Sequence, residues 1–125
     1  MKIFQPRPKK SPKIYGYTEL SPEYDGLIKI GYTEREVNDR MKEHYPTLGP
    51  KGIERYKILL EESSMRNDGT SFIDKNVHKI LENAGFKNVG GEWFKCSYED
   101  VKAAIIAAKN KTNIDLDRFN NFSLR

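Results

Sequence analysis

The stretch that decides the fold is LIKIGYTEREVNDRMKEHY, residues 27–45. Its first four residues, Leu27–Ile30, are apolar and mostly β-branched apart from one lysine, which predicts a strand that Gly31 ends. Thr33 and Glu36 then have the spacing of a capping box, in which the threonine caps a helix and the glutamate reaches back to it. The rest of the stretch is therefore predicted to be a helix.

This predicted helix carries two functional candidates beside its apolar stripe. The stripe, spaced at i, i+4 and i+8, consists of Val37, Met41 and Tyr45. Arg40 and His44 each follow a stripe residue by three positions, so both face the surface on which the helix packs. An arginine and a histidine that face a strand carrying Lys29 indicate a phosphate-binding site.

The remaining elements follow from strand alternation, helical periodicity and turn residues. In chain order they are a strand over 13–18 that pairs as a hairpin with the one over 27–31, a strand over 53–62, a helix over 71–84, a short strand over 92–96 and a helix over 97–110. The order β-β-α-β-α-β-α predicts a small α/β domain of the α+β kind. Its mostly antiparallel sheet of three or four strands would be flanked by helices.

Composition limits the class of protein and its compartment. Charged residues make up 32% of the 125 residues and the mean hydropathy is −0.77. No apolar run approaches the roughly 20 residues of a membrane span, so we expect no membrane partner. The single cysteine, Cys96, excludes an internal disulfide and suits the reducing cytoplasm. We expect a cytoplasmic protein in which Cys96 is a buried structural thiol.

Charge and proline content divide the chain into three parts. They are a basic flexible arm over 1–12, the folded domain over 13–110, and a linker over 111–125 that we expect to lead to a further domain. Residues 1–13 hold five basic residues and no acid, whereas the whole chain has a net charge of +4, so the remainder sums to about −1. Lys9, Lys10 and Lys13 are therefore candidates for salt-dependent contacts with DNA phosphates. The same composition also fits a solvated tail.

Several short motifs in the right order resemble the GIY-YIG endonuclease domain. In chain order they are Lys13–Tyr15 at the GIY position, Lys29–Gly31 at the YIG position, Arg40 at the helix arginine, His44 one turn later, His78, and the EWF tripeptide Glu92–Phe94. A phage and bacterial subgroup of this family, with KIG in place of YIG and a later histidine and EWF, is the most similar. The resemblance covers about residues 13–110.

The resemblance implies a metal-dependent DNA endonuclease that hydrolyses phosphodiester bonds. Tyr15, helped by Lys29 or His44, would take the proton of the attacking water. Arg40 would hold the phosphate oxygens as charge develops on them. Asp74 would bind Mg²⁺ or Mn²⁺, which polarises the scissile phosphate.

Further residues take supporting roles in the same hypothesis. Arg35 would join the basic arm in contacting DNA, while His78 and Glu92 would orient the site residues. The run Phe119–Arg125 resembles the approach to a helicase motor. It therefore implies a restriction or phage-defence protein with a covalently linked helicase-like domain.

Two departures from the family pattern leave an alternative open. Lys29 stands where the family has its second tyrosine, and Asp74 stands where it has a metal-binding glutamate. Aspartate binds hard cations through oxygen but is one methylene shorter, and its spacing from Ser71 also fits a capping box. Arg40 has an ordinary explanation too, as the ion-pair partner of Glu36. The alternative is a catalytically silent nucleic-acid-binding module in a larger helicase-type protein.

Overall fold

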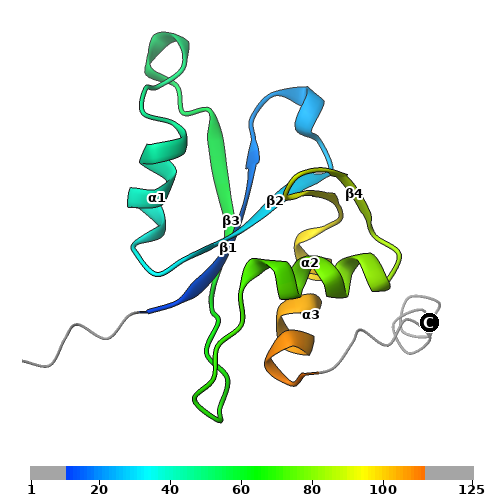
Figure 1. Cartoon of the computed structure of the whole chain (residues 1–125). Coiled ribbons are helices and arrows are strands. Elements are labelled where there is room, and N and C mark those ends of the chain that lie inside the picture. The colour runs from blue at the N-terminus through cyan, green and yellow to red at the C-terminus, as the bar shows by residue number, and fades with distance from the viewer. Residues whose placement is uncertain (1–10, 112–125) are drawn as a thin grey trace, which may run out of the picture.

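One twisted antiparallel sheet is the framework of the domain. The computed structural model describes residues 11–111 of the chain. Within these residues, five strands form one sheet in the order β3-β1-β2-β5-β4 (Figure 1). The strands are β1 (Lys13–Glu19), β2 (Leu27–Thr33), β3 (Tyr56–Ser63), β4 (Lys87–Gly90) and β5 (Trp93–Lys95).

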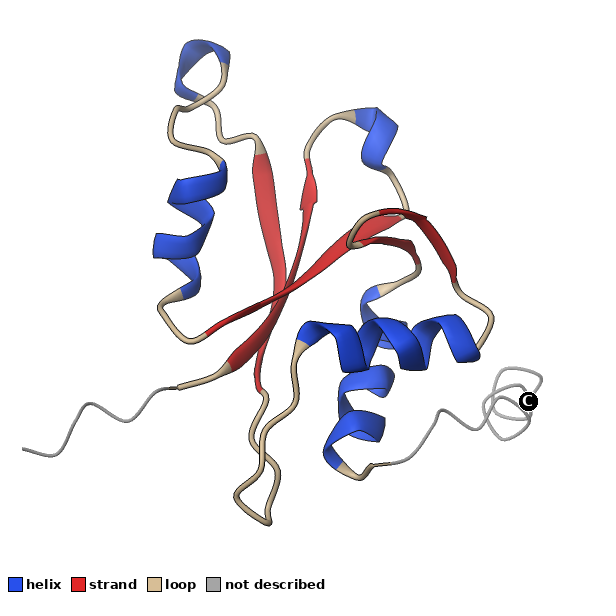
Figure 2. Cartoon of the chain, in the orientation of Figure 1, coloured by secondary structure: helices blue, strands red, loops and turns tan. Residues whose placement is uncertain are grey.

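Three helices flank this sheet within the described range. They are α1 (Val37–His44), α2 (Asp74–Asn83) and α3 (Tyr98–Lys109), and two short 3-10 turns lie at Pro22–Tyr24 and Pro50–Gly52. Figure 2 shows α1 apart from α2 and α3, which lie together on the other side of the strands. The predicted fold class, a small α+β domain with a mostly antiparallel sheet flanked by helices, is confirmed.

Side-chain alternation along β1 separates two hydrophobic clusters. Ile14 faces α2 and α3, where it packs with residues such as Ile30, Val77 and Phe94 in a cluster of almost entirely aliphatic and phenylalanine side chains. Tyr15 and Tyr17 face α1 instead. Their cluster is completed by Val37, Met41, Tyr45, Tyr56, Ile58 and Trp93. The two faces of one sheet therefore have different chemistry.

The prediction of three or four strands in the order β-β-α-β-α-β-α is wrong by one strand. The order is β-β-α-β-α-β-β-α, because residues between the predicted helix over 71–84 and the predicted strand over 92–96 form β4, which pairs with β5. All of β4 is exposed and half of it is Asn and Gly, so neither alternation nor strand propensity reveals it. Asn88 closes the hairpin: its Oδ1 accepts from the Gly90 backbone N–H at 2.8 Å and its Nδ2 donates to the Gly91 carbonyl at 2.9 Å.

Helix α1 begins three residues later than predicted. Thr33 does not cap it; its Oγ1 accepts instead from the backbone N–H of Arg35 at 3.1 Å, and Glu36 takes the N-cap position. The reason is the sheet, because Thr33 is still paired with Lys13 of β1. Strand pairing therefore carries β2 beyond Gly31.

Helix α2 also begins three residues later than predicted. The chain before it stays extended: Ser71 forms a bridge with Met65, and the Phe72 backbone N–H donates to the Ser64 carbonyl at 3.0 Å. The strand predicted over 53–62 likewise shifts, to Tyr56–Ser63. Helix α3 begins as predicted, where its capping box joins Ser97 and Asp100 through bonds of 3.2 and 2.8 Å.

Two predicted segments lie almost wholly outside the described residues. The basic arm over 1–12 and the linker over 111–125 overlap with the described chain only at Ser11, Pro12 and Lys111. Among residues 11–111, no helix is both long enough and apolar enough to span a membrane.

Candidate active site

Tyr15 lies across the backbone of β2 at Gly31. The two residues are cross-strand partners in the β1–β2 pair. A Cβ atom built on Gly31 would lie 2.6 Å from both Cζ and Oη of Tyr15, so the ring occupies the space that any other side chain would need. Only 2% of Tyr15 is exposed. The glycine of the KIG motif thus holds the Tyr15 hydroxyl in a fixed place.

Arg40 reaches this hydroxyl from α1. Burial raises the pKa of Tyr15, and a hydrogen bond with Arg40 together with the arginine's charge opposes that rise. The guanidinium also binds Glu43, with Nη1 to Oε2 at 2.7 Å, and Glu43 binds Arg35 at 2.6 Å. Hydrogen bonds from both arginines lower the pKa of Glu43 to about 2. The ion-pair partner of Arg40 is therefore Glu43. The ordinary explanation for Arg40, an ion pair with Glu36, is wrong.

Two carboxylates complete this region from the other side of β2. Asp74 is the first residue of α2, and Glu92 lies between β4 and β5, where its carbonyl accepts from the Ile30 backbone N–H at 3.1 Å. Burial, and then a hydrogen bond with Asp74 and the charge of its carboxylate, raise the pKa of Glu92. The charges of both also raise the pKa of Tyr15.

The capping explanation for Asp74 is wrong. The backbone N–H of Ile73 donates to Oδ1 of Asn76 at 2.9 Å, so Asn76 supplies the side chain that closes the first turn of α2. The expected partner, Ser71, is still extended in the preceding bridge. Asp74 is therefore free of that capping role and faces Glu92.

Lys29 lies beside Tyr17 and not beside Tyr15, contrary to expectation. Antiparallel pairing sets Lys29 opposite Tyr17 on one side and Trp93 on the other. Its Nζ is 5.7 Å from the centroid of the Tyr17 ring. Lys29 opposes the rise in the pKa of Tyr17 that burial causes. Strand parity placed Lys29 on the correct face, but the register decides which tyrosine it meets.

His44 lies on the same face, 6.3 Å from the Tyr17 ring between centroids. Burial, and then the charges of Lys29 and Arg40, lower the pKa of His44 below its ordinary 6.5. The imidazole is therefore neutral at neutral pH and able to accept a proton. Tyr15, Lys29, Arg40 and His44 all lie on the α1 side of the sheet, while their catalytic roles stay predictions.

His78 supports this site from the opposite face. Its Nε2 lies 2.8 Å from the carbonyl oxygen of Ile30, so this nitrogen carries the proton and donates. Its ring lies 5.1 Å from that of Phe94. His78 thus anchors the β2 backbone one residue before Gly31, a placement that fits the predicted supporting role.

The predicted DNA-contacting residues have different surroundings. Lys13 lies between Glu36 at 3.5 Å and Glu61 at 3.6 Å, and only 17% of its side chain is exposed, so it joins the start of α1 to β3. Arg35 is 58% exposed but bound to Glu43. Lys9 and Lys10 lie outside the described residues. Their contacts with DNA stay predictions.

The two carboxylates at this site are chemically suited to bind a hard divalent cation, although they form a small set of ligands. Within residues 11–111, no group of three or more His, Cys, Asp or Glu side chains could hold a metal ion. Asp74 and Glu92 supply two facing carboxylates, and oxygen donors are the ligands that Mg²⁺ and Mn²⁺ prefer. Mg²⁺ commonly uses one or two carboxylates, with waters and substrate phosphate filling the other positions.

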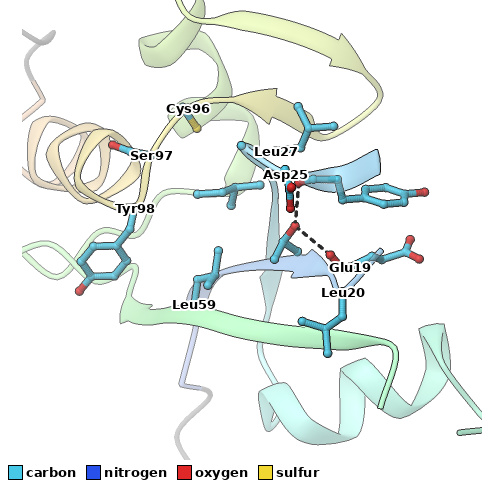
Figure 3. Close-up of a pocket in the computed structure, with 12 residues that line it drawn as sticks. Glu19, Leu20, Asp25, Leu27, Leu59, Cys96, Ser97 and Tyr98 are labelled. Atoms are coloured by element: carbon cyan, nitrogen blue, oxygen red, sulfur yellow. Dashed lines mark hydrogen bonds between the residues drawn. The ribbon is translucent and has the colours of Figure 1, made fainter. Parts of the chain in front are cut away.

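A cavity elsewhere on the domain does not share this chemistry. It measures about 290 Å³ and is lined by residues around Leu27, Leu59 and Cys96 (Figure 3). Among the described residues, its lining includes two acids, Glu19 and Asp25, and no base, which is the wrong charge for a phosphate. Cys96, expected to be buried, is only half-buried and lines this cavity, although burial raises the pKa of its thiol to about 12.

Two contributors were missed by the sequence-based argument. Tyr17 follows Tyr15 by two positions on a strand, so parity alone indicated that both face α1. Glu43 follows Arg40 by three positions on a helix, the spacing of an intrahelical ion pair. The contact between Asp74 and Glu92 had no such signal, because it depends on how α2 and the β4–β5 hairpin pack.

The fold and this site define a small α+β domain in which tyrosine, arginine and paired carboxylates meet at one sheet. The family model described as the T5orf172 domain matches residues 14–109. The chain belongs to this family of nuclease-related domains. No curated protein and no solved structure was found to match the chain.

Proposed function

We propose that the domain is a metal-dependent DNA endonuclease of the GIY-YIG type. The observation that supports this most is the convergence of Tyr15, Arg40, Asp74 and Glu92, which come from β1, α1, α2 and the turn between β4 and β5. A buried hydroxyl between a guanidinium and two carboxylates offers phosphate binding, proton transfer and cation binding together. Mg²⁺ or Mn²⁺ held by Asp74 and Glu92 would polarise the scissile phosphate and stabilise the leaving oxygen.

Arg40 binds the phosphate in this proposal. A guanidinium offers two parallel N–H donors to phosphate oxygens and stabilises the charge that develops on them. Glu43 holds the Arg40 side chain near Tyr15 until DNA arrives. Lys29 is placed to contact a neighbouring phosphate, beside Tyr17.

Tyr15 takes the proton of the attacking water in this proposal. Burial and the charges of Glu92 and Asp74 keep the Tyr15 hydroxyl protonated at neutral pH, and Arg40 opposes them only in part. A cation bound at the two carboxylates would remove their contribution and add positive charge beside the hydroxyl, and both changes would lower the pKa of Tyr15. His44, which is already neutral, is the second group able to accept this proton.

The test is a cleavage assay with the full 125-residue chain. Supercoiled, linear and branched DNA are incubated with Mg²⁺ or Mn²⁺, and Tyr15→Phe is compared with Tyr98→Phe, which changes an exposed tyrosine on α3. We expect cleavage by the wild-type chain and by Tyr98→Phe, and loss of cleavage in Tyr15→Phe. A wild-type chain that cuts none of these substrates with either metal contradicts the proposal.

A second function is favoured by one observation, the engagement of Arg40 by Glu43. An arginine already neutralised by a carboxylate fits a module that binds nucleic acid without cutting it. In that case the wild-type chain binds DNA in the same assay and leaves it intact. For both functions we propose that Lys9, Lys10, Lys13 and Arg35 contact the DNA backbone. A restriction or phage-defence context with a linked helicase-like domain stays a proposal that depends on residues 119–125 alone.

A further inference from the structure

A group of aromatic rings borders the candidate active site. We call it the aromatic platform; it consists of Tyr17, Tyr24, Tyr45, Tyr56 and Trp93. Tyr17 is its centre, with centroid distances of 5.9 Å to Tyr45, 6.3 Å to Tyr56 and 5.8 Å to Trp93, each in an edge-on arrangement. Two outer pairs flank it, Tyr45 with Tyr56 and Tyr24 with Trp93, each with centroids 4.8 Å apart.

The outer rings of the platform are partly exposed, although its centre is buried. Tyr17 is 2% exposed, whereas the four outer aromatic residues each retain intermediate exposure. Nearby, Val37 and Met41 pack α1 tightly against the sheet and are 2% and 0% exposed. Tyr45, Tyr56 and Trp93 pack against the same cluster, but part of the polarisable surface of all four outer rings still reaches solvent.

The platform adjoins the groups that we propose to bind phosphate. The rings of Tyr15 and Tyr17 stack with centroids 6.2 Å apart and an interplanar angle of 10°. Lys29 lies over Tyr17 and pairs with Trp93 across the sheet. Two acids lie against the Tyr24 end of these rings. Glu19 hydrogen-bonds the hydroxyl groups of Tyr24 and Tyr45, and the charge of Glu23 also raises the pKa of Tyr24. Arg40 and Lys29 thus lie at the Tyr15–Tyr17 end, beside the carboxylates proposed to bind metal, and Glu19 and Glu23 lie at the Tyr24 end.

This polarity matches a nucleotide, with its phosphate at Arg40 and Lys29 and its base on the rings. Bases in an intact duplex are stacked on one another and present only their edges, whereas an unpaired base can stack on aromatic side chains. Partly exposed rings beside the proposed phosphate-binding groups therefore favour a strand of nucleic acid with exposed bases.

We propose that the aromatic platform stacks unpaired bases, so that the preferred DNA of this domain contains a single-stranded segment beside the bound phosphate. This inference rests on the proposed function and adds its substrate class. Aromatic stacking in single-strand binding proteins is worth about 1–3 kcal/mol per base on truncation, which corresponds to roughly 5- to 150-fold in affinity.

Trp93 is the only tryptophan of the chain and reports directly on the platform. The full-length protein is titrated, with EDTA present so that nothing is cut, against a labelled single strand, a duplex, and a duplex with a central unpaired bubble. Affinity is followed by fluorescence anisotropy of the label, and base contact by quenching of Trp93. We expect the single strand and the bubble to bind more tightly than the duplex and to quench Trp93.

Variants separate stacking from general binding. Tyr45→Leu and Tyr24→Leu keep an apolar side chain but remove a ring from each outer pair, and each should weaken single-strand binding by roughly 5- to 150-fold. Tyr98→Leu removes an exposed tyrosine from α3 and should leave binding unchanged. Thermal melts verify folding, and using one variant from each pair keeps the test decisive if the other fails to fold.

Equal affinity for single strand and duplex, or unchanged single-strand binding in both folded variants, overturns the inference. In that result the proposed function still stands if the wild-type chain cuts duplex DNA with metal present. Failure to bind any of the three DNAs overturns the inference and the proposed function together.

Discussion

The two faces of the sheet are made by the same strands but differ in almost every physical property. On the α2–α3 face, the cluster around Ile14, Ile30 and Phe94 is aliphatic or phenylalanine and sealed from water. On the α1 face, the cluster contains tyrosines and a tryptophan, and charged side chains lie against them. Alternation along a strand lets one residue stabilise the domain while its neighbour serves a site. The comparison predicts that mutations separate by face: stability on one, DNA chemistry on the other.

The largest effect is expected from a truncation on the stable face. Leu81→Ala removes a fully buried side chain from α2, and large-to-small changes in a core cost about 2–5 kcal/mol of the free energy of unfolding. Urea denaturation followed by circular dichroism measures this loss. Glu82→Ala, at the exposed position next to it, should change stability by no more than about 0.5 kcal/mol. Similar values for the two variants would contradict the distinction between the faces.

The next largest effect is expected on the rate of DNA cleavage, with the stability of the domain nearly unchanged. Arg40→Ala removes the proposed phosphate ligand, and the loss of such a charge-stabilising donor lowers the cleavage rate by about 10²- to 10³-fold. Arg55→Ala is the matched control, because Arg55 is an exposed arginine outside the proposed site, in the loop before β3. Cleavage rates under metal saturation and melting temperatures are compared for both. Equal loss of cleavage in the two variants would show that only overall charge matters.

Substitutions of Asp74 test the part of the candidate active site that α2 contributes. Asp74→Asn keeps the shape of the side chain but removes the charge that a hard cation needs, so Mn²⁺ binding by calorimetry and cleavage should both be lost. Stability should fall by only about 0.3–1 kcal/mol, through the lost interaction with the helix dipole. Asp74→Glu restores the acid at the helix start, so both metal binding and cleavage should survive.

The same variant has a consequence for Glu92 that needs no metal. Because Asp74 raises the pKa of Glu92, Asp74→Asn should lower that pKa towards its ordinary value. Carbon-13 NMR of the side-chain carboxyl followed through acid pH measures the change. An unchanged Glu92 titration would mean that the two carboxylates do not face each other in solution.

The smallest effect concerns Glu43. Its carboxylate is held by two arginines, which lower its pKa in the folded state to about 2 from the ordinary value of 4.5. The group therefore contributes stability that is present above about pH 4.5 and is lost as the pH falls towards 2. Glu43→Gln should flatten the pH dependence of the melting temperature in this window only. It should also raise DNA affinity less than about tenfold, because Arg40 loses a competing anion; weaker DNA binding would count against this.

The sequence was sufficient for local structure and for the faces on which residues lie. Periodicity located the strands around Tyr15 and Lys29 and the helix that carries Arg40, and parity put all three on one side of the sheet. The register of the β1–β2 pair could not be predicted from the sequence, because pairing Lys29 with Tyr17 depends on the length of the turn between the two strands. Strand β4 could not be predicted either, since its exposed residues are held by pairing with β5 and not by strand propensity.

Contacts between distant segments were the least predictable part. Asp74 and Glu92 are brought together only when α2 and the β4–β5 hairpin dock on β2. The late starts of α1 and α2 have the same origin, because β-bridges hold Thr33 and Ser71 extended against their local helix signals. Tertiary hydrogen bonds decided these boundaries.

The fit of the Tyr15 ring over Gly31 also has a consequence for folding. In a hairpin, a slip by two residues keeps every side chain on its correct face, so hydrophobicity alone does not reject it. Such a slip would bring Tyr15 opposite Lys29 or Thr33, where a Cβ atom stands in the space that the ring now fills. Only the native alignment of β1 and β2 gives the ring a bare backbone to lie on. The contact that positions a proposed catalytic hydroxyl therefore also discriminates the native hairpin from its nearest misfolded neighbour.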